Sequence, residues 1–168
     1  MSTFESLAFY RGMSEEIPTD RVSLVVPRTD RRPRNSSLAF HKAADQWFES
    51  HFGVCYRSGG VFVTARPEAT LVYAASPSHV MRVIPLSAYK YCWSPAVSDL
   101  LFAATEYADG APDPVNAYLD RAQYLQSDLE AAHASGHEVM LSCDRYVAIP
   151  IGLLGGTIAE RPSIIVPA

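Results

Sequence analysis

Three short segments carry side chains that could support chemistry on a charged ligand. Arg11 follows an apolar opening run, and an arginine at a strand end presents a planar guanidinium suited to phosphate or carboxylate. Thr64 ends a second apolar run, where a hydroxyl can orient a ligand or a neighbouring side chain. Glu138 precedes a third run, where a carboxylate can stabilise a developing positive charge or accept a proton.

Each of these residues also has a purely structural interpretation. Arg11 could pair with a nearby acid such as Glu15 or Glu16, and Thr64 could cap the turn that follows it. Glu138 could be an exposed residue at the start of a strand. Taken singly, none of the three predicts a function, because short motifs recur by chance.

The order of the three residues resembles the Arg–Ser–Glu arrangement of the ADP-ribosyltransferase superfamily. In that family a strand ending in Tyr-Arg-Gly supplies the arginine, and here the residues at 10–12 are Tyr-Arg-Gly. The family's Phe-x-Ser-Thr-Ser strand corresponds to Phe62-Val63-Thr64-Ala65, with Thr64 at the first serine. The family's catalytic glutamate corresponds to Glu138, which is followed by Val139-Met140-Leu141 and, after a turn, Tyr146-Val147.

The resemblance implies a split β-sheet with a cleft that binds NAD as a substrate. It implies that Arg11 holds a phosphate, Thr64 orders the site, and Glu138 stabilises the ribose cation while nicotinamide leaves. Tyr73, on a short helix after Thr64, is a further candidate for binding the dinucleotide. The sequence departs from the family at Ala65 and at Gly136, where many members carry a second glutamate, so arginine-modifying activity is not implied.

An arginine-rich segment forms a separate candidate binding surface. Arg28, Arg31, Arg32 and Arg34 fall within seven residues, with Asp30 among them, and could contact a phosphate, a nucleic acid or an acidic partner. A solvated loop, partly neutralised by Asp30, is the equally weighted alternative. In a variant of the NAD hypothesis, Arg28 rather than Arg11 holds the phosphate.

The segment that follows the arginine-rich loop contributes two more candidates: His41, at the opening of an amphipathic helix, as a cofactor-binding residue, and Arg57, just after that helix. The loop together with this helix resembles small proteins of unknown role carried by tailed phages. The rival to the enzyme hypothesis is therefore a non-enzymatic, phage-like accessory or host-directed binding protein that uses the arginine-rich loop as its contact surface.

Hydrophobic periodicity and turn residues predict a single α+β domain with a mixed, mainly antiparallel split sheet and three to four helices. Strands are expected at 7–10, 22–26, 61–64, 80–86, 138–141 and 145–151, and a short helix at 67–75. Longer helices are expected at 36–52, 94–104 and from Asp113 to Gly136, the first capped by Asn35 or Ser36. The last residues, about 152–168, are expected to form a tail or a strand, with a strand and turn over 149–158.

Composition narrows the class of protein. With 168 residues, 48% hydrophobic residues and a net charge of −4, the chain can bury a core and is not a globally basic nucleic-acid binder. Cys55, Cys92 and Cys143 are far apart, and no histidine pair has metal-ligand spacing, so neither a disulfide framework nor a metal site is expected. No signal peptide or membrane span is expected either, which favours a cytoplasmic protein with reduced thiols. The acceptor, if there is one, could be a protein or a nucleic acid.

Overall fold

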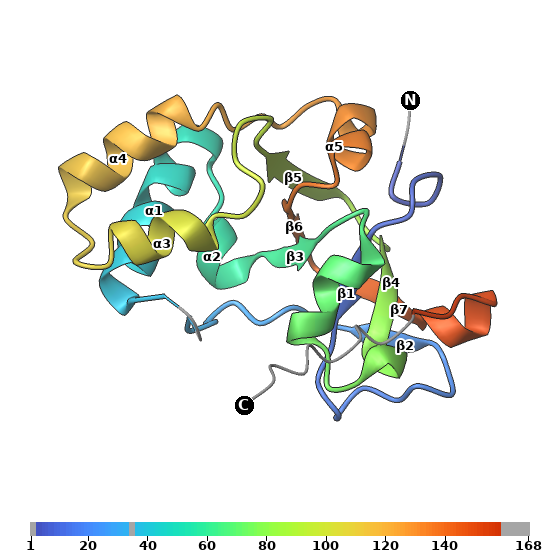
Figure 1. Cartoon of the computed structure of the whole chain (residues 1–168). Helices are drawn as coiled ribbons and strands as arrows, with labels where there is room; N and C mark the ends of the chain where they lie inside the picture. Colours follow the sequence, from blue (N-terminus) through green and yellow to red (C-terminus); the bar gives the residue numbers. More distant parts are fainter. Residues whose placement is uncertain (1–2, 34–35, 159–168) are drawn as a thin grey trace, which may run out of the picture.

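Two antiparallel sheets organise the chain in the computed structural model, which describes residues 3–33 and 36–158 (Figure 1). The first sheet has the strand order β1-β4-β7-β2, and its strands are β1 (Tyr10–Gly12), β2 (Ser23–Val25), β4 (Val80–Pro85) and β7 (Tyr146–Pro150). The second sheet has the order β3-β6-β5, with β3 (Val61–Val63), β5 (Tyr89–Trp93) and β6 (Val139–Cys143). The predicted fold class, a single α+β domain with an antiparallel split sheet, is confirmed.

The chain passes between the two sheets at short connections. β4 leads into β5, and β6 leads into β7, so in each case consecutive strands belong to different sheets. A third link joins β1 to the end of β3, where Tyr10 and Thr64 exchange backbone hydrogen bonds of 2.7 and 3.0 Å. These links place the start of β1, the end of β3 and the start of β6 at one junction.

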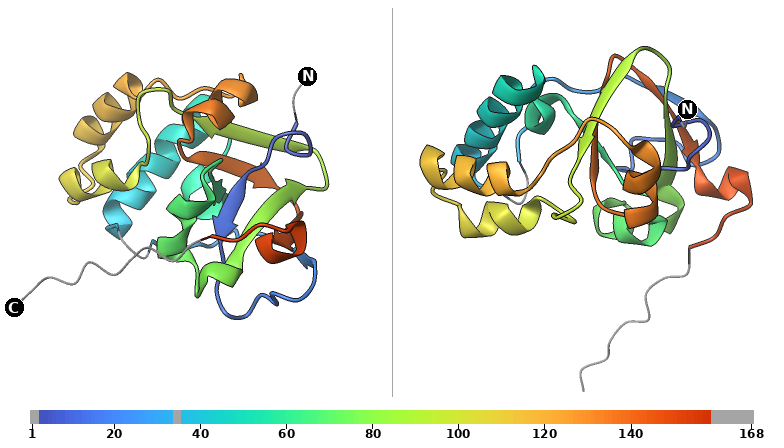
Figure 2. Two further views of the ribbon diagram at one scale, coloured as in Figure 1. Left: turned by 45° about the vertical axis from the view of Figure 1, so that its right-hand side comes forward. Right: turned by 90° about the horizontal axis from the view of Figure 1, so that it is seen from above.

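Most helices lie to one side of the sheets, as Figure 2 shows from above. α1 (Leu38–Phe52) packs against α4 (Pro112–Arg121) and α2 (Tyr56–Gly59), while α3 (Leu101–Glu106) lies beside them and α5 (Leu129–Ser135) stands apart. The cap of α1 is Ser37, whose side chain accepts from the Phe40 amide at 3.0 Å, rather than Asn35 or Ser36 as predicted. Three short 3-10 helices complete the described part of the chain: η1 (Pro67–Tyr73), η2 (Pro77–His79) and η3 (Ile151–Leu154).

The second sheet is buried on both faces, because its side chains alternate between two hydrophobic clusters. One of these clusters lies between the two sheets. It contains Val61, Val63, Val139 and Leu141 of the second sheet, together with Phe9 and Met81 on the side of the first sheet. Cys92 and Met140 point the other way, into the helical cluster formed by residues such as Phe40, Phe48 and Leu119. The sheet therefore has fixed inner and outer faces, which sets the direction of any side chain at its ends.

The helix predicted from Asp113 to Gly136 is divided in two. α4 ends at Arg121, and α5 starts only at Leu129, with Gln123 and Asp128 in the left-handed region between them. There Leu125 and Trp93 exchange backbone hydrogen bonds of 2.8 and 3.0 Å, so this segment pairs with the end of β5 instead of continuing the helix. The sequence-based prediction missed β5 itself, and with it the partner that interrupts the helix.

Two other predicted elements differ in extent. The helix expected from Ser94 begins only at Leu101, because the Ser94 hydroxyl accepts from the Ala96 and Val97 amides and holds a turn there. The strand expected to continue beyond Pro150 becomes η3, and residues 159–168 of the predicted tail lie outside the described residues. No helix among the described residues has both the length and the apolar character needed to cross a membrane.

Candidate functional site

Thr64 and Glu138 stand opposite each other just beyond the last paired residues of β3 and β6. The register pairs Val63 with Val139, so one step further places Thr64 across from Glu138. Side chains alternate along a strand, which puts Thr64 and Glu138 on the same face of the sheet as Phe62 and Met140. The structure thus brings together two of the three residues that the sequence singled out, although 74 positions separate them along the chain.

The Thr64 hydroxyl ties the end of β3 to the turn before Glu138. It donates to the Gly136 carbonyl at 2.8 Å and accepts from the Arg66 amide at 3.2 Å. The second contact is the local cap that the sequence offered as an alternative. The first contact joins residues that are far apart in the sequence, and it fixes the backbone two residues before Glu138. Thr64 therefore positions Glu138 whatever else it contacts.

The loop formed by residues 94–100 also holds the backbone next to Glu138. The Glu138 amide donates to the Ser98 carbonyl at 2.9 Å, and the His137 Nδ1 lies 2.9 Å from the Ser94 carbonyl. The segment 94–100 therefore runs alongside 136–138, next to the start of α3. These contacts bring Asp99 toward the carboxylate of Glu138, although nothing in the sequence between residues 94 and 104 marked that acid as part of a site.

The environment of Glu138 raises the pKa of its carboxyl from 4.5 to about 7. Burial is the largest cause, because it penalises the charged form, and the nearby carboxylate of Asp99 adds to it. The charges of Arg57 and Arg31 and a backbone hydrogen bond from Leu100 act in the opposite direction and lower the pKa. A half-buried carboxyl with this pKa changes its charge near neutral pH, which is a property expected of functional groups.

The two arginines whose charges act on the Glu138 carboxyl, Arg57 and Arg31, both lie against the ring of Phe62. The guanidinium carbon of Arg31 lies 4.3 Å from the ring centroid, and that of Arg57 lies 4.8 Å from it. Arg31 also donates to the Gly60 carbonyl at 3.4 Å. Both distances are within the range of cation–π contacts, so one aromatic ring supports two positive charges beside Glu138.

Arg11 reaches the backbone of Phe62, not its ring, from β1. Its Nη1 donates to the Phe62 carbonyl at 3.4 Å. Burial raises the pKa of Tyr146, and the charge of Arg11 acts to lower it. The arginine charges that act on Glu138 are instead those of Arg57 and Arg31. Arg11 therefore lies at the junction with Thr64 and Phe62, on the side toward β7.

Tyr73 and His41, two further candidates for binding the dinucleotide, differ in their exposure. Tyr73 ends η1 and is 49% exposed, and its pKa is raised by burial and then by the charges of Asp99 and Glu138, which places its hydroxyl near both acids. His41 is buried in α1, where burial lowers its pKa, the carboxylate of Asp45 at 3.9 Å raises it, and the charges of Arg57 and Arg31 lower it. Tyr73 is thus accessible to a ligand, while the burial of His41 contradicts its predicted role in binding the dinucleotide.

The arginine-rich segment is divided by the fold. Arg31 is half-buried against Phe62, whereas Arg28 and Arg32 are exposed, and Arg28 pairs with Asp30 at 3.2 Å. Arg34 lies outside the described residues. The Arg31 amide also donates to the Ser58 carbonyl at 3.1 Å, so the loop is fastened to α2. A contact surface on this loop would consist of the remaining exposed arginines.

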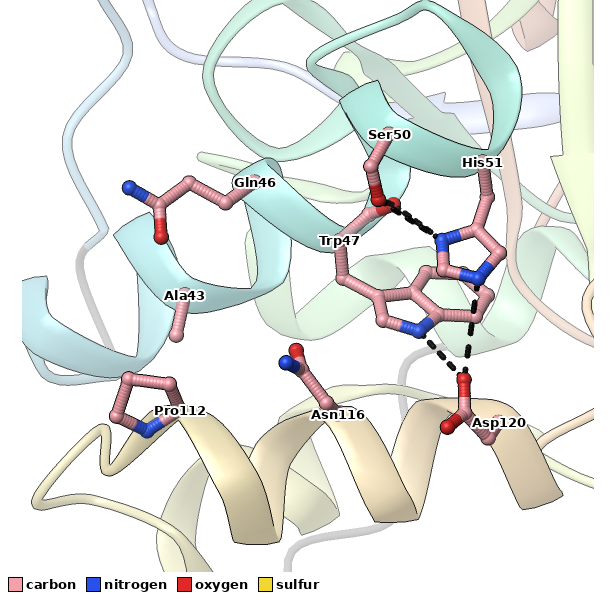
Figure 3. A pocket seen from close by; sticks show the side chains of 8 residues that line it. All are labelled: Ala43, Gln46, Trp47, Ser50, His51, Pro112, Asn116 and Asp120. Atoms are coloured by element: carbon pink, nitrogen blue, oxygen red, sulfur yellow. Dashed lines mark hydrogen bonds and ion pairs between the residues drawn. The ribbon is translucent and has the colours of Figure 1, made fainter.

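A separate pocket lies between α1 and α4, with a volume of about 260 Å³ (Figure 3). In it, Asp120 accepts from the Trp47 indole at 2.8 Å and lies 3.9 Å from the Nε2 of His51, which stacks on Trp47. The hydroxyl of Ser50 donates to the Trp47 carbonyl at 2.8 Å and also lies 3.0 Å from the Nδ1 of His51. That Nδ1 lies 2.8 Å from the same carbonyl, so the Ser50 and His51 side chains both contact the backbone of α1. The pocket shares no residue with the group around Phe62 and Glu138; its lining consists of Ala43, Gln46, Trp47, Ser50, His51, Pro112, Asn116 and Asp120.

The described residues contain no group of three His, Cys, Asp or Glu side chains arranged to hold a metal ion. The chemistry available at the junction is therefore that of a carboxyl titrating near neutral pH, several guanidinium groups and two hydroxyls. Comparison with known proteins adds no relative: no family model matches the sequence, and neither a curated protein nor a solved structure matches it.

Proposed function

We propose that this protein is an ADP-ribosyltransferase-like enzyme that uses NAD as a substrate and transfers ADP-ribose to a protein or nucleic-acid acceptor. One observation carries the proposal: Thr64 and Glu138 face each other at the strand junction to which Arg11 also belongs. The resemblance in sequence order thereby acquires a spatial counterpart. Tyr73, close to Glu138 and half exposed, adds an aromatic ring on which a ligand's base or pyridine ring could stack.

In this proposal Glu138 acts by charge. The bond between C1′ of the ribose and the nicotinamide nitrogen breaks, its electron pair leaves with nicotinamide, and positive charge develops on the sugar. An ionised carboxylate beside that carbon stabilises the cation more than it stabilises the substrate, which lowers the barrier. A nucleophilic oxygen or nitrogen of the acceptor then forms the new bond to C1′ and releases its proton to the carboxylate or to water.

The other residues hold the reacting parts in place. Arg11 presents a guanidinium fork suited to a phosphate oxygen, and Thr64 fixes the turn that carries Glu138. The pKa of about 7 for Glu138 means that substrate and pH together set its charge. The positive charge of the bound nicotinamide ring favours the ionised form, because an opposite charge lowers the pKa of a carboxyl.

The test is release of nicotinamide from NAD by the purified full chain, measured by chromatography at pH 8. We expect release above that of the same protein after heat denaturation, with water as the acceptor when no other is added. Absence of release, both alone and with added cell extract as a source of acceptors, would contradict the proposal. That outcome would favour the rival, a binding protein that uses its exposed arginines.

Thr64 provides a graded prediction for the same assay. Thr64→Val keeps the shape but removes the hydrogen bond to Gly136, and we expect nicotinamide release to fall about fivefold, since one such bond is worth roughly 1 kcal/mol. Thr64→Ser keeps the hydroxyl and should retain most of the rate. If Thr64→Val keeps the wild-type rate while Thr64→Ser loses it, the hydroxyl does not position Glu138 and the methyl group is what matters.

A further inference from the structure

The Arg57 side chain is the most unusual buried cation among the described residues. It is only 7% exposed, and its Nε is buried without a hydrogen-bond partner in the part of the chain that the structure describes. An arginine is always charged, and burying one of its donors without a hydrogen-bond partner is costly. A buried donor in this state calls for an explanation, and a bound ion or ligand group is one that fits it.

Its backbone, in contrast, is firmly held. The carboxylate of Asp45, on α1, accepts from the Arg57 amide at 2.7 Å and from the Ser58 amide at 3.0 Å. These two bonds fix the start of α2, so the direction in which Arg57 leaves the backbone is set. The Asp45 carboxylate thus accepts from two backbone amides. The Arg57 guanidinium lies over the ring of Phe62, and its charge acts on Glu138.

Arg31 brings a second guanidinium to the same ring. Both guanidinium carbons lie within 5 Å of the Phe62 centroid, and both charges act on Glu138. Phe62 and Arg31 are half-buried, so this platform reaches the surface on the side of Glu138 and Tyr73. Two planar, fork-shaped donors on one aromatic ring match a ligand that carries two linked phosphates better than one that carries a single carboxylate.

We infer that Arg57 and Arg31, stacked on Phe62, form a pyrophosphate-binding subsite for a nucleoside diphosphate group. This inference rests on the proposed function, because the dinucleotide NAD contains such a group, and it adds to the site two cations beyond Arg11. Because the charges of Arg57 and Arg31 act on Glu138, a pyrophosphate held between these arginines would lie near that carboxylate.

The experiment is calorimetric titration of the full chain with ADP-ribose and, separately, with inorganic pyrophosphate. We expect Arg57→Gln to weaken ADP-ribose binding at least tenfold and Arg57→Lys to restore part of it, since lysine keeps the charge but not the fork. Arg145→Gln, an exposed arginine at the turn between β6 and β7, is the matched control and should bind as the wild type does. Circular dichroism checks that each variant is folded.

Arg31→Gln serves as the second variant, because its side chain is only half-buried and its loss leaves α2 intact. Unchanged ADP-ribose affinity in folded Arg57→Gln, or in Arg31→Gln should Arg57→Gln fail to fold, would overturn the inference, as would a wild type that binds neither probe. Binding that depends on Arg57 in a chain that never releases nicotinamide would support the subsite and refute the proposed enzyme. Nicotinamide release by a chain whose ADP-ribose affinity is unchanged in both arginine variants would refute the subsite and support the proposed enzyme.

Discussion

Glu138→Gln should release nicotinamide from NAD about 100 to 1000 times more slowly than the wild type at pH 8. The amide keeps the size and the hydrogen-bonding capacity of the side chain but carries no negative charge. Removing one preorganised electrostatic contact to a charged transition state typically costs a factor of this size. Binding of ADP-ribose should change much less, because the carboxylate acts on the ribose cation, which forms only as nicotinamide leaves.

The matched control is Glu106→Gln, which removes a carboxylate from the exposed end of α3. Its rate should equal that of the wild type within error, and initial rates for the three proteins are measured by chromatography of nicotinamide. A Glu138→Gln rate within twofold of the wild type would show that the carboxylate takes no part in catalysis.

The stability of the protein should depend on pH through the same residue. The pKa of Glu138 is about 7 in the folded chain, against 4.5 for an unperturbed carboxyl, so between these values the folded state holds a proton that the unfolded state has lost. Protonation therefore favours folding below about pH 4.5, and this contribution is lost as pH rises through 7. A shift of this size corresponds to about 3 kcal/mol of unfolding free energy.

Comparison with Glu138→Gln isolates this effect. The groups near Glu138 are the same in both proteins, so effects that do not involve the residue 138 carboxyl largely cancel; they are Arg57, Arg31, Asp99, Tyr73, Cys92 and Tyr124. The free energy of unfolding by urea, measured from pH 4.5 to 8, should decline in the wild type relative to the variant by that amount. A difference that stays constant over this range would mean that the carboxyl titrates normally and is well solvated.

Much of the scaffold was predictable because its signals are local. The strands β4, β6 and β7 and the helix α1 are marked by runs of apolar residues with clear turn or cap residues at their ends. Gly136 ends a helix in the left-handed conformation, as its position in the sequence predicts. The interruption between Arg121 and Leu129 was not predictable, because it depends on pairing with Trp93 of a strand that itself carries a weak pattern.

The candidate site shows the same division. Arg11, Thr64 and Glu138 were identified because each ends or begins a short apolar run and their order resembles that of a known family. Arg57 was singled out without a partner, and the roles of Phe62, Asp45 and Asp99 were not foreseen. These three act only through contacts between distant parts of the chain, for which one sequence holds no local signal.

For a related reason, the sequence did not predict which arginine of the arginine-rich loop would be half-buried and which would stay exposed. Four arginines in seven residues have the same local chemistry, yet Arg31 is drawn onto Phe62 while Arg28 and Arg32 remain exposed. The difference arises from the hydrogen bond between the Arg31 amide and Ser58, which lies 27 positions further along the chain. Tertiary contacts of this kind decide which residue of a charged segment belongs to a site.

The most direct test of the central claim is a crystal structure of Glu138→Gln grown with NAD, since the variant should leave the substrate intact. The account predicts the ribose of the nicotinamide beside residue 138, with the phosphates toward Arg11 and the arginines on Phe62. Density for NAD in the pocket between α1 and α4, or on the far side of the sheets from residue 138, would contradict it.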